Sequence, residues 1–246
     1  MPPRKKKEIA QPPPTAEIIN YYEHMPSEFL DVKTPNPNKY LHHMDIPFRG
    51  VCVAPSGSGK SLFVTNLIHL FSKDNGTFTS IDIICKDKDE PLYKFLQSKS
   101  DSITVKEGLH NMFQLDKYEK NTAHLLIIDD MQLEDKNSLE RVCQTYIRGR
   151  KRGVSILFLA QNYFYIPKVI RNNCNYFIIL KISGERELNI ILKEQASGLS
   201  KDQLLHMYEY ATHEKFSPLI VDIESSDKYH KFRKGFSEYL SPDEFR

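Results

Sequence analysis

The fold of this chain is decided by one stretch, Arg49-Gly50-Val51-Cys52-Val53-Ala54-Pro55-Ser56-Gly57-Ser58-Gly59-Lys60-Ser61. The apolar run from Val51 to Ala54 ends in a loop with two glycines, and residues 62–71 after the loop are apolar at helical spacing. This pattern predicts the order strand, loop, helix. A phosphate-binding loop needs that order, because unpaired backbone N–H groups at a helix N-terminus attract negative charge.

The residue types in the loop predict that it binds a nucleotide polyphosphate with Mg²⁺. Gly57 and Gly59 permit backbone angles that are closed to residues with a Cβ atom. Lys60 supplies a cation for the β- and γ-phosphates, and the Ser61 hydroxyl is a ligand for Mg²⁺. The expected nucleotide-binding residues are Pro55, Ser56, Gly57, Ser58, Gly59, Lys60 and Ser61.

The loop departs at one position from the pattern G-x-x-x-x-G-K-[ST], because Ala54 stands where the first glycine is expected. Alanine fits there if the residue keeps strand-like backbone angles. The alternative is a surface turn rich in serine and glycine that happens to contain a lysine. The strand before the loop and the amphipathic helix after it favour the phosphate-binding loop.

Composition indicates a globular protein with one large domain or a domain with an appendage. Of the 246 residues, 40% are apolar and 27% are charged, as in soluble proteins. The sequence has neither an apolar run of the ~20 residues needed to span a bilayer nor the apolar core of a signal peptide, so we expect an intracellular protein with no membrane partner. The net charge of +2 gives no argument for nucleic-acid binding, and the spacing of the four cysteines does not suggest a metal site.

A second motif is the run His124-Leu125-Leu126-Ile127-Ile128-Asp129-Asp130. Four consecutive large aliphatic residues predict a strand buried on both faces, and two carboxylates follow at its carboxyl end, where α/β sheets bind ligands. We expect Asp129 to hold Mg²⁺ through water and Asp130 to polarise the water that attacks the γ-phosphate. An ordinary acidic turn after a strand is the alternative.

A third motif joins a basic helix end to another buried strand. Residues 137–150 predict a helix that closes in Gly149-Arg150-Lys151-Arg152-Gly153, and residues 154–160 predict a strand that delivers Gln161 at its end. The amide of Gln161 can hydrogen-bond the attacking water or the γ-phosphate, or it can merely cap a turn.

Strands and helices alternate along the chain, which predicts an α/β fold with a mostly parallel sheet between layers of helices. We expect a flexible arm over residues 1–40 with one short helix near 16–23, an ATPase core over 41–225, and a hairpin strand and loose tail over 226–246. Residues 109–118 are expected to be helical. Local basic groups occur at Lys86, Lys88 and the basic residues from Lys228 to Lys234; each can contact nucleic-acid phosphates or equally be solvated surface.

The three motifs, together with Ile46-Pro47-Phe48-Arg49-Gly50 before the loop, resemble the poxvirus-type genome-packaging ATPases of the FtsK/HerA superfamily, which large DNA viruses and virophages encode. The resemblance covers roughly residues 45–225. It implies a RecA-like P-loop core that hydrolyses ATP with Mg²⁺. It also implies a ring of identical subunits, a hexamer or pentamer, that moves double-stranded DNA into a capsid through a capsid or portal-type partner. The implied location is the infected host cell, in a cytoplasmic virus factory or with the virion.

The resemblance further implies an arginine finger that reaches into the neighbouring subunit's site. Arg150 matches that position, and Arg148 and Arg152 compete with it. The alternative is a basic helix end that interacts with the helix dipole. Asp130 stands where bacterial members of the superfamily have glutamate, which shortens the reach to the attacking water and leaves the identity of the base open.

Two other functions remain compatible with the sequence. One is a helicase or DNA-segregation pump of the same superfamily, although the chain has no obvious extra helicase motif or separate DNA-binding module. The other is a switch or kinase that binds a nucleotide without moving DNA; a kinase would need an acceptor site and a lid, and neither is recognisable in the sequence.

Overall fold

The computed structural model describes residues 19–26, 34–131, 133–195 and 198–245. The chain divides into two compact units, Met1–Lys33 and Thr34–Arg246. In the first unit the structure describes one short 3-10 helix, η1 (Tyr21–Glu23). Of the helix expected near residues 16–23, residues 16–18 lie outside the described residues, and the described part contains only the 3-10 helix η1.

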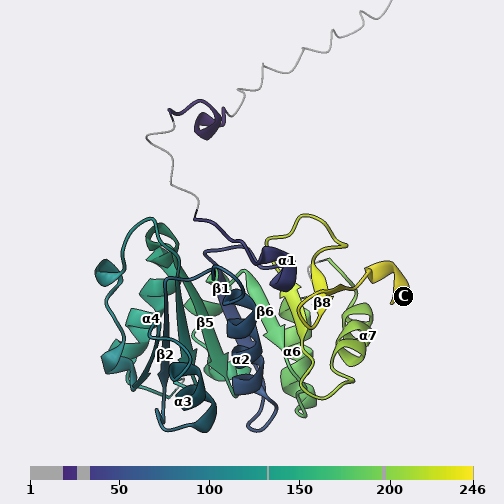
Figure 1. Ribbon diagram of the computed structural model, residues 1–246. Helices are drawn as coiled ribbons and strands as arrows, with labels where there is room; N and C mark the ends of the chain where they lie inside the picture. The colour runs from purple at the N-terminus through teal and green to yellow at the C-terminus, as the bar shows by residue number, and fades with distance from the viewer. Residues whose placement is uncertain (1–18, 27–33, 132, 196–197, 246) are drawn as a thin grey trace, which may run out of the picture. The chain divides into compact units, whose positions relative to one another are not determined.

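The second unit is built on a mixed sheet of nine strands in the order β3-β2-β4-β5-β1-β6-β7-β8-β9 (Figure 1). The strands from β3 to β6 in this order are parallel, and β7, β8 and β9 continue the sheet antiparallel. The expected α/β class is confirmed. The strands are β1 (Arg49–Val53), β2 (Ser80–Cys85), β3 (Ile103–Glu107), β4 (His124–Asp129), β5 (Val154–Ala160), β6 (Tyr176–Ile179), β7 (Leu219–Asp222), β8 (Phe232–Lys234) and β9 (Glu238–Tyr239).

Helices cover both faces of this sheet. Apolar side chains of α2 and α3 pack on one face, and those of α4, α5, α6 and α7 pack on the other. The α-helices are α1 (Lys39–His42), α2 (Lys60–Phe71), α3 (Pro91–Gln97), α4 (Lys136–Arg148), α5 (Lys168–Asn173), α6 (Glu185–Gln195) and α7 (Lys201–Ala211). None of the described helices is long and apolar enough to cross a bilayer.

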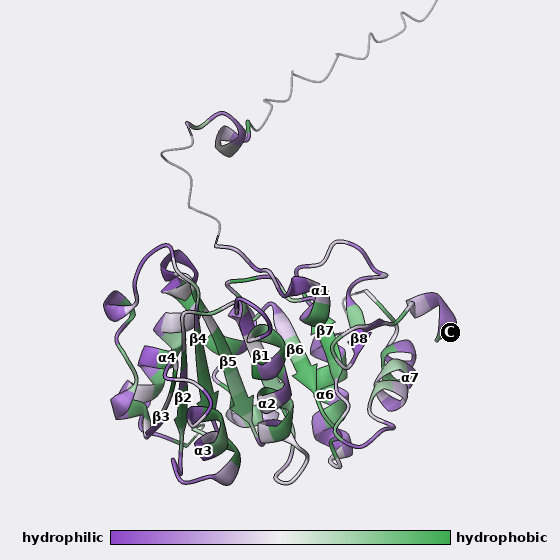
Figure 2. Cartoon of the chain, viewed as in Figure 1, coloured by the Kyte–Doolittle hydropathy of each residue, from purple (hydrophilic) through white to green (hydrophobic). Residues whose placement is uncertain are grey.

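The central strands are apolar along their length because both of their faces are covered. Every residue of β4 and β5 is buried, and these strands are coloured as hydrophobic in Figure 2. Side chains alternate between the two layers, so Val51 and Val53 of β1 join one core while Cys52 joins the other. The carboxyl ends of the parallel strands lie together at one end of the sheet, where residues that follow several strands can meet.

The segment 109–118 is not the expected helix. It forms two 3-10 turns, η3 (Leu109–Asn111) and η4 (Leu115–Lys117), separated by an extended Met112. The guanidinium of Arg141 on α4 donates to the backbone carbonyls of Leu109 and Met112, at 3.5 and 2.5 Å. A long-range donor thus takes carbonyls that an α-helix would use within itself.

The compact unit begins at Thr34, before the boundary expected at residue 41. The side-chain amide of Asn38 is buried and donates to the carbonyls of Phe71 and Lys73, both at 2.9 Å. These carbonyls lie at and just beyond the C-terminus of α2, where backbone acceptors need partners from outside the helix. Residues just before β1 therefore cap the helix that follows the phosphate-binding loop.

The C-terminal segment forms the expected hairpin and continues beyond it. Strand β8 pairs antiparallel with β7, and β9 pairs with β8. The acidic end, expected to be loose, forms a 3-10 turn, η7 (Pro242–Glu244). Pro242 is buried there, and its carbonyl accepts a hydrogen bond from Gln203 of α7 at 3.3 Å.

Candidate nucleotide-binding site

The loop between β1 and α2 has the conformation that the sequence predicts. Gly57 and Gly59 have φ angles of +75° and +95°, and α2 begins at Lys60. The Lys60 side chain is only 9% exposed, and its ammonium donates to the carbonyls of Ala54 at 2.8 Å and Pro55 at 3.2 Å. The loop therefore wraps around the lysine that would meet a phosphate.

Phe216, which the sequence did not single out, closes one side of this loop. A Cβ atom added to Gly59 would lie 2.4 Å from Cδ1 of Phe216. Phe216 itself has a φ angle of +69°, which is costly for a bulky residue and is kept where the surroundings demand it. Gly59 is thus required both by its backbone angle and by the close approach of an aromatic ring.

Asp129, the last residue of β4, is 7% exposed. Burial raises its pKa to about 6, and the hydrogen bond from Tyr93 opposes that rise. The Tyr93 hydroxyl donates to Oδ2 at 2.5 Å, whereas Oδ1 is buried without a hydrogen-bond partner in the described structure. A buried acceptor of this kind is costly unless something else binds it.

Tyr93 links the two residues expected at the metal. Its hydroxyl bonds to Asp129, and the side chain of Ser61 also forms a hydrogen bond with it. Burial raises the pKa of Tyr93, so the hydroxyl stays protonated and donates. Sequence patterns do not indicate this residue, because Tyr93 has the spacing of an ordinary apolar position of α3 and lies 36 positions from Asp129 in the chain.

Asp130 follows β4 in the left-handed region, with a φ angle of +56°. Its Oδ2 accepts from the amide of Gln161 at 2.6 Å and pairs with the ammonium of Lys86 at 3.1 Å. The carboxylate is therefore held between the residues that follow the two strands flanking β4. Sequence patterns place Asp130 and Gln161 each at the attacking water and predict neither their direct hydrogen bond nor the ion pair with Lys86.

These groups share one cavity of about 510 Å³. Of the predicted residues, Pro55, Ser58 and Arg150 do not line it. The lining consists of Ser56, Gly57, Gly59, Lys60, Ser61, Leu62, Cys85, Lys86, Asp87, Glu90, Leu92, Asp129, Asp130, Gln161 and Phe216.

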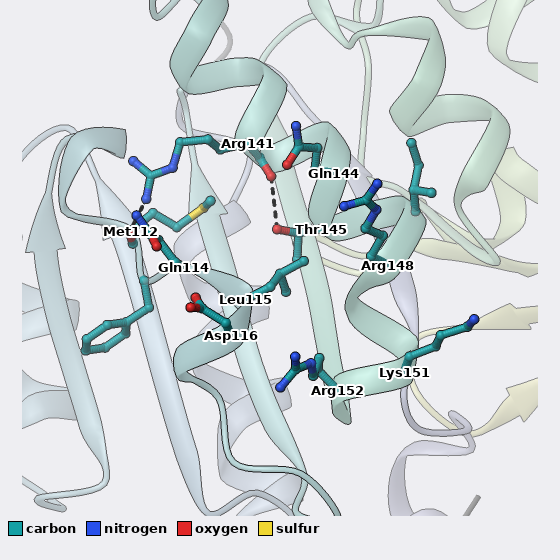
Figure 3. A pocket seen from close by; sticks show the side chains of 12 residues that line it. Met112, Gln114, Leu115, Asp116, Arg141, Gln144, Thr145, Arg148, Lys151 and Arg152 are labelled. Carbon is teal, nitrogen blue, oxygen red and sulfur yellow. Dashed lines mark hydrogen bonds between the residues drawn. The ribbon is translucent and has the colours of Figure 1, made fainter.

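Arg150 lies at the amino ends of the parallel strands, opposite the end that carries the nucleotide-binding loop. It belongs to η5 (Gly149–Arg152), just before β5, whereas Gln161 follows the carboxyl end of that seven-residue strand. A strand of this length spans roughly 23 Å. Arg148 and Arg152 line a different groove, shown in Figure 3, together with Arg141 of α4. None of the three candidate fingers can therefore reach the nucleotide-binding loop of its own subunit.

The basic residues named as candidate DNA contacts differ in their surroundings. Lys86 lines the cavity, whereas Lys228 pairs with Asp243 at 3.0 Å on the exposed surface. The half-buried Lys234 pairs with Glu214 at 2.7 Å. Lys88 is exposed. Arg233, within the second group, is buried and donates to the carbonyl of His43, so it is not a DNA contact in this structure. The predicted contacts at Lys88 and at the other basic residues from Lys228 to Lys234 stay predictions.

The residues present fit Mg²⁺ held together with a nucleotide. No group of three or more His, Cys, Asp or Glu side chains among the described residues could hold a metal ion on its own. Mg²⁺ in nucleotide sites uses one or two protein oxygens, substrate phosphates and water. Ser61 and the unpartnered Oδ1 of Asp129 supply such oxygens.

The model of the family described as Poxvirus A32 protein matches residues 38–226. That range contains the loop, both aspartates and Gln161, so it includes every part of the cavity. The chain belongs to this family. The A32-family relatives include DNA packaging protein OPG160 of Vaccinia virus (strain Copenhagen), which is 28% identical over 196 residues covering 74% of this chain and 71% of the relative. The Variola virus OPG160 has the same identity and coverage.

Solved structures show the same fold. The DNA-packaging ATPase B204 of Sulfolobus turreted icosahedral virus superposes with a TM-score of 0.56 at 16% identity, over 75% of this chain and 96% of B204. The genome packaging NTPase B204 of Sulfolobus turreted icosahedral virus 2, in complex with ATP-gammaS, gives a TM-score of 0.52 at 14% identity, over 75% of this chain and 96% of that chain. The expected P-loop ATPase fold of the A32-family chain is thereby confirmed.

Gly59→Ala should lower the affinity for an ATP analogue by at least about tenfold, because the new methyl group meets Phe216 while the backbone stays in a region that favours glycine. Isothermal titration with a non-hydrolysable analogue measures the effect. Gly76→Ala is the control, since Gly76 also has a positive φ but open space around it. Adding Phe216→Ala should recover part of the affinity. Unchanged binding by Gly59→Ala would contradict the fit of the loop.

The raised pKa of Asp129 predicts a pH-dependent stability. The unfolded carboxyl ionises near its ordinary value of 3.8 and the folded one near 6, so the folded state binds more protons between these values and loses stability as pH rises through them. Asp129→Asn removes this loss, and its free energy of unfolding should exceed the wild-type value by about 2 to 3 kcal/mol at pH 7.5.

Urea unfolding at pH 4.5 and 7.5 checks this expectation. The advantage of Asp129→Asn should shrink at pH 4.5, where the wild-type carboxyl is largely protonated in the folded state. Asp101→Asn on an exposed turn is the control and should change the stability by less than about 0.5 kcal/mol at both values. An advantage of the same size at the two pH values would contradict the assignment.

Proposed function

We propose that the protein is an ATP-hydrolysing motor that moves double-stranded viral DNA into a capsid. The observation that carries the proposal is the shared cavity, where the loop around Lys60 meets Asp129, Asp130 and Gln161. The ATPase fold supports hydrolysis, and family membership supports its use in packaging, because the Vaccinia and Variola relatives are named DNA packaging proteins.

The chain would bind ATP through its loop and the start of α2. Backbone N–H groups of residues 56–61 would receive the phosphates, and the ammonium of Lys60 would exchange the carbonyls of Ala54 and Pro55 for phosphate oxygens. Ser61 and Asp129 would hold Mg²⁺, which on binding neutralises charge on the β- and γ-phosphates. Tyr93 would keep the carboxylate of Asp129 in place through its hydroxyl.

Hydrolysis would use Asp130 and Gln161, the polar residues that follow β4 and β5. The oxygen of a water molecule forms a bond to the γ-phosphorus while the bond from that phosphorus to the bridging oxygen of ADP breaks. Asp130 accepts the proton of the water, and the Gln161 amide, which already donates to Asp130, holds the water and carboxylate in line. Lys60 stabilises the negative charge on the transferring phosphoryl group.

A ring of subunits would complete the site. An arginine at the edge opposite the nucleotide-binding loop can act only on a nucleotide held by another copy, and Arg150 is exposed at that edge. DNA would pass through the ring by contacts to its phosphates, which makes the binding dependent on salt and independent of sequence. We further propose that the ring meets a capsid or portal-type protein in the infected cell, in virus factories or with the virion.

Lys60→Ala should abolish DNA-stimulated ATP hydrolysis, because the cation for the β- and γ-phosphates is lost. Release of inorganic phosphate with and without double-stranded DNA measures the activity. Lys73→Ala, at an exposed lysine beyond the end of α2, is the control and should retain it. No hydrolysis by the wild-type protein with Mg²⁺ and DNA, or full activity of Lys60→Ala, would overturn the proposed function.

Arg150→Ala subunits should bind ATP normally and yet lower the activity of wild-type subunits when the two are mixed, because each mutant removes a finger from its neighbour. Activity per subunit should also rise with protein concentration. Parallel mixing of Arg148→Ala and Arg152→Ala identifies which of the three arginines is the finger. Activity that follows the wild-type fraction linearly for all three variants would argue against a shared site.

A further inference from the structure

Three charged residues of the cavity, Lys86, Asp87 and Glu90, belong to none of the motifs, and of these Lys86 pairs with Asp130. Lys86 follows β2, and the register of β2 on β4 pairs Ile84 with Ile128. Strand β2 ends at Cys85 and β4 at Asp129, so Lys86 and Asp130 are the first residues beyond two paired strands. The parallel register therefore brings the lysine and the carboxylate to the same end of the sheet.

Asp130 is held from both sides by this arrangement. Its Oδ2 pairs with the Lys86 ammonium at 3.1 Å and accepts from the Gln161 amide at 2.6 Å. Its Oδ1 is buried and has no hydrogen-bond partner in the part of the chain that the structure describes. One oxygen is thus fixed by two donors, and the other is the acceptor that remains for a reacting group.

This ion pair differs from the surface pairs nearby. The side chain of Asp130 is 19% exposed and that of Lys86 is 49% exposed, so the lysine reaches inward from the mouth of the cavity. In the Lys94–Asp89 pair, by contrast, both side chains are 59% exposed. Fully exposed pairs contribute little to stability because water and salt screen them, which makes Lys94 a suitable reference for Lys86.

We propose that Lys86 is a positioning residue for ATP hydrolysis, a role that rests on the proposed function: its ammonium fixes Oδ2 of Asp130 against Gln161, so that Oδ1 takes the proton of the attacking water. Lys86 acts through Asp130 and Gln161. Its loss leaves the nucleotide-binding loop intact, because neither Lys60 nor Ser61 depends on it for a hydrogen bond described here.

Lys86→Met should lower kcat by at least about tenfold while the affinity for an ATP analogue changes by less than about twofold, since a small misplacement of a reacting group slows chemistry more than binding. Lys86→Arg should retain most of the activity, because the guanidinium also donates to a carboxylate. Lys94→Met is the matched control and should keep both values.

A double-mutant cycle separates this role from a general structural one. If Lys86 acts through Asp130, then Lys86→Met added to Asp130→Asn should cause little further loss of kcat, whereas independent effects would multiply. The inference would be overturned if the losses of kcat in the two single variants multiplied in the double variant, or if Lys86→Met left kcat unchanged. Either result leaves the proposed motor standing, provided that Lys60→Ala has lost its activity. An inactive wild-type protein would instead remove the proposed function itself.

Discussion

The parallel register of four neighbouring strands is the constraint on which the site depends. Strands β2, β4, β5 and β1 lie side by side in that order, and all run the same way. Their carboxyl ends deliver, in the same order, Lys86, Asp130, Gln161 and the phosphate-binding loop. A slip by one residue in any of these pairings would turn the strand's side chains to the opposite faces and move its last polar group away from the cavity.

The buried charges of the cavity are tolerated because neighbouring groups compensate them. Asp129 sits where burial disfavours its ionised form, and the Tyr93 hydroxyl offsets part of that cost. Lys60 is nearly buried and satisfies its ammonium with two backbone carbonyls. A metal-bound polyphosphate would offer Asp129 the metal and Lys60 the phosphates, each a stronger partner than the residue has within the chain. Nucleotide binding would therefore offset the cost of burying these two charges. Asp130 and Phe216, which line the same cavity, both have positive φ angles. Backbone strain of this kind is concentrated at functional sites, where it is kept at a cost in stability.

Sequence patterns predicted the parts of the site that follow from local rules. Periodicity and glycine placement indicated β1, the loop and α2, and the aliphatic run before Asp129 indicated a strand buried on both faces. The contributions of Tyr93, Lys86 and Phe216 arise from contacts across 36, 44 and 157 positions, for which spacing in the chain holds no signal. The helix expected at 109–118 failed for the same reason, because its carbonyls bond to a distant arginine.

The basic turn at the amino end of β5, which carries Arg150, is held in a fixed shape. Gly153 ends the turn with a φ angle of +66°, and a Cβ atom on it would lie 2.0 Å from the carbonyl oxygen of Thr122. The turn is therefore pinned to the segment that enters β4, the strand that carries Asp129 and Asp130 at its other end. Strands β4 and β5 are buried throughout and paired along their length, so the basic turn and the residues Asp129 and Asp130 lie at the two ends of one rigid pair of strands. In the proposed ring, the pair of strands that positions Asp130 and Gln161 in one subunit would therefore also position the arginine offered to the next.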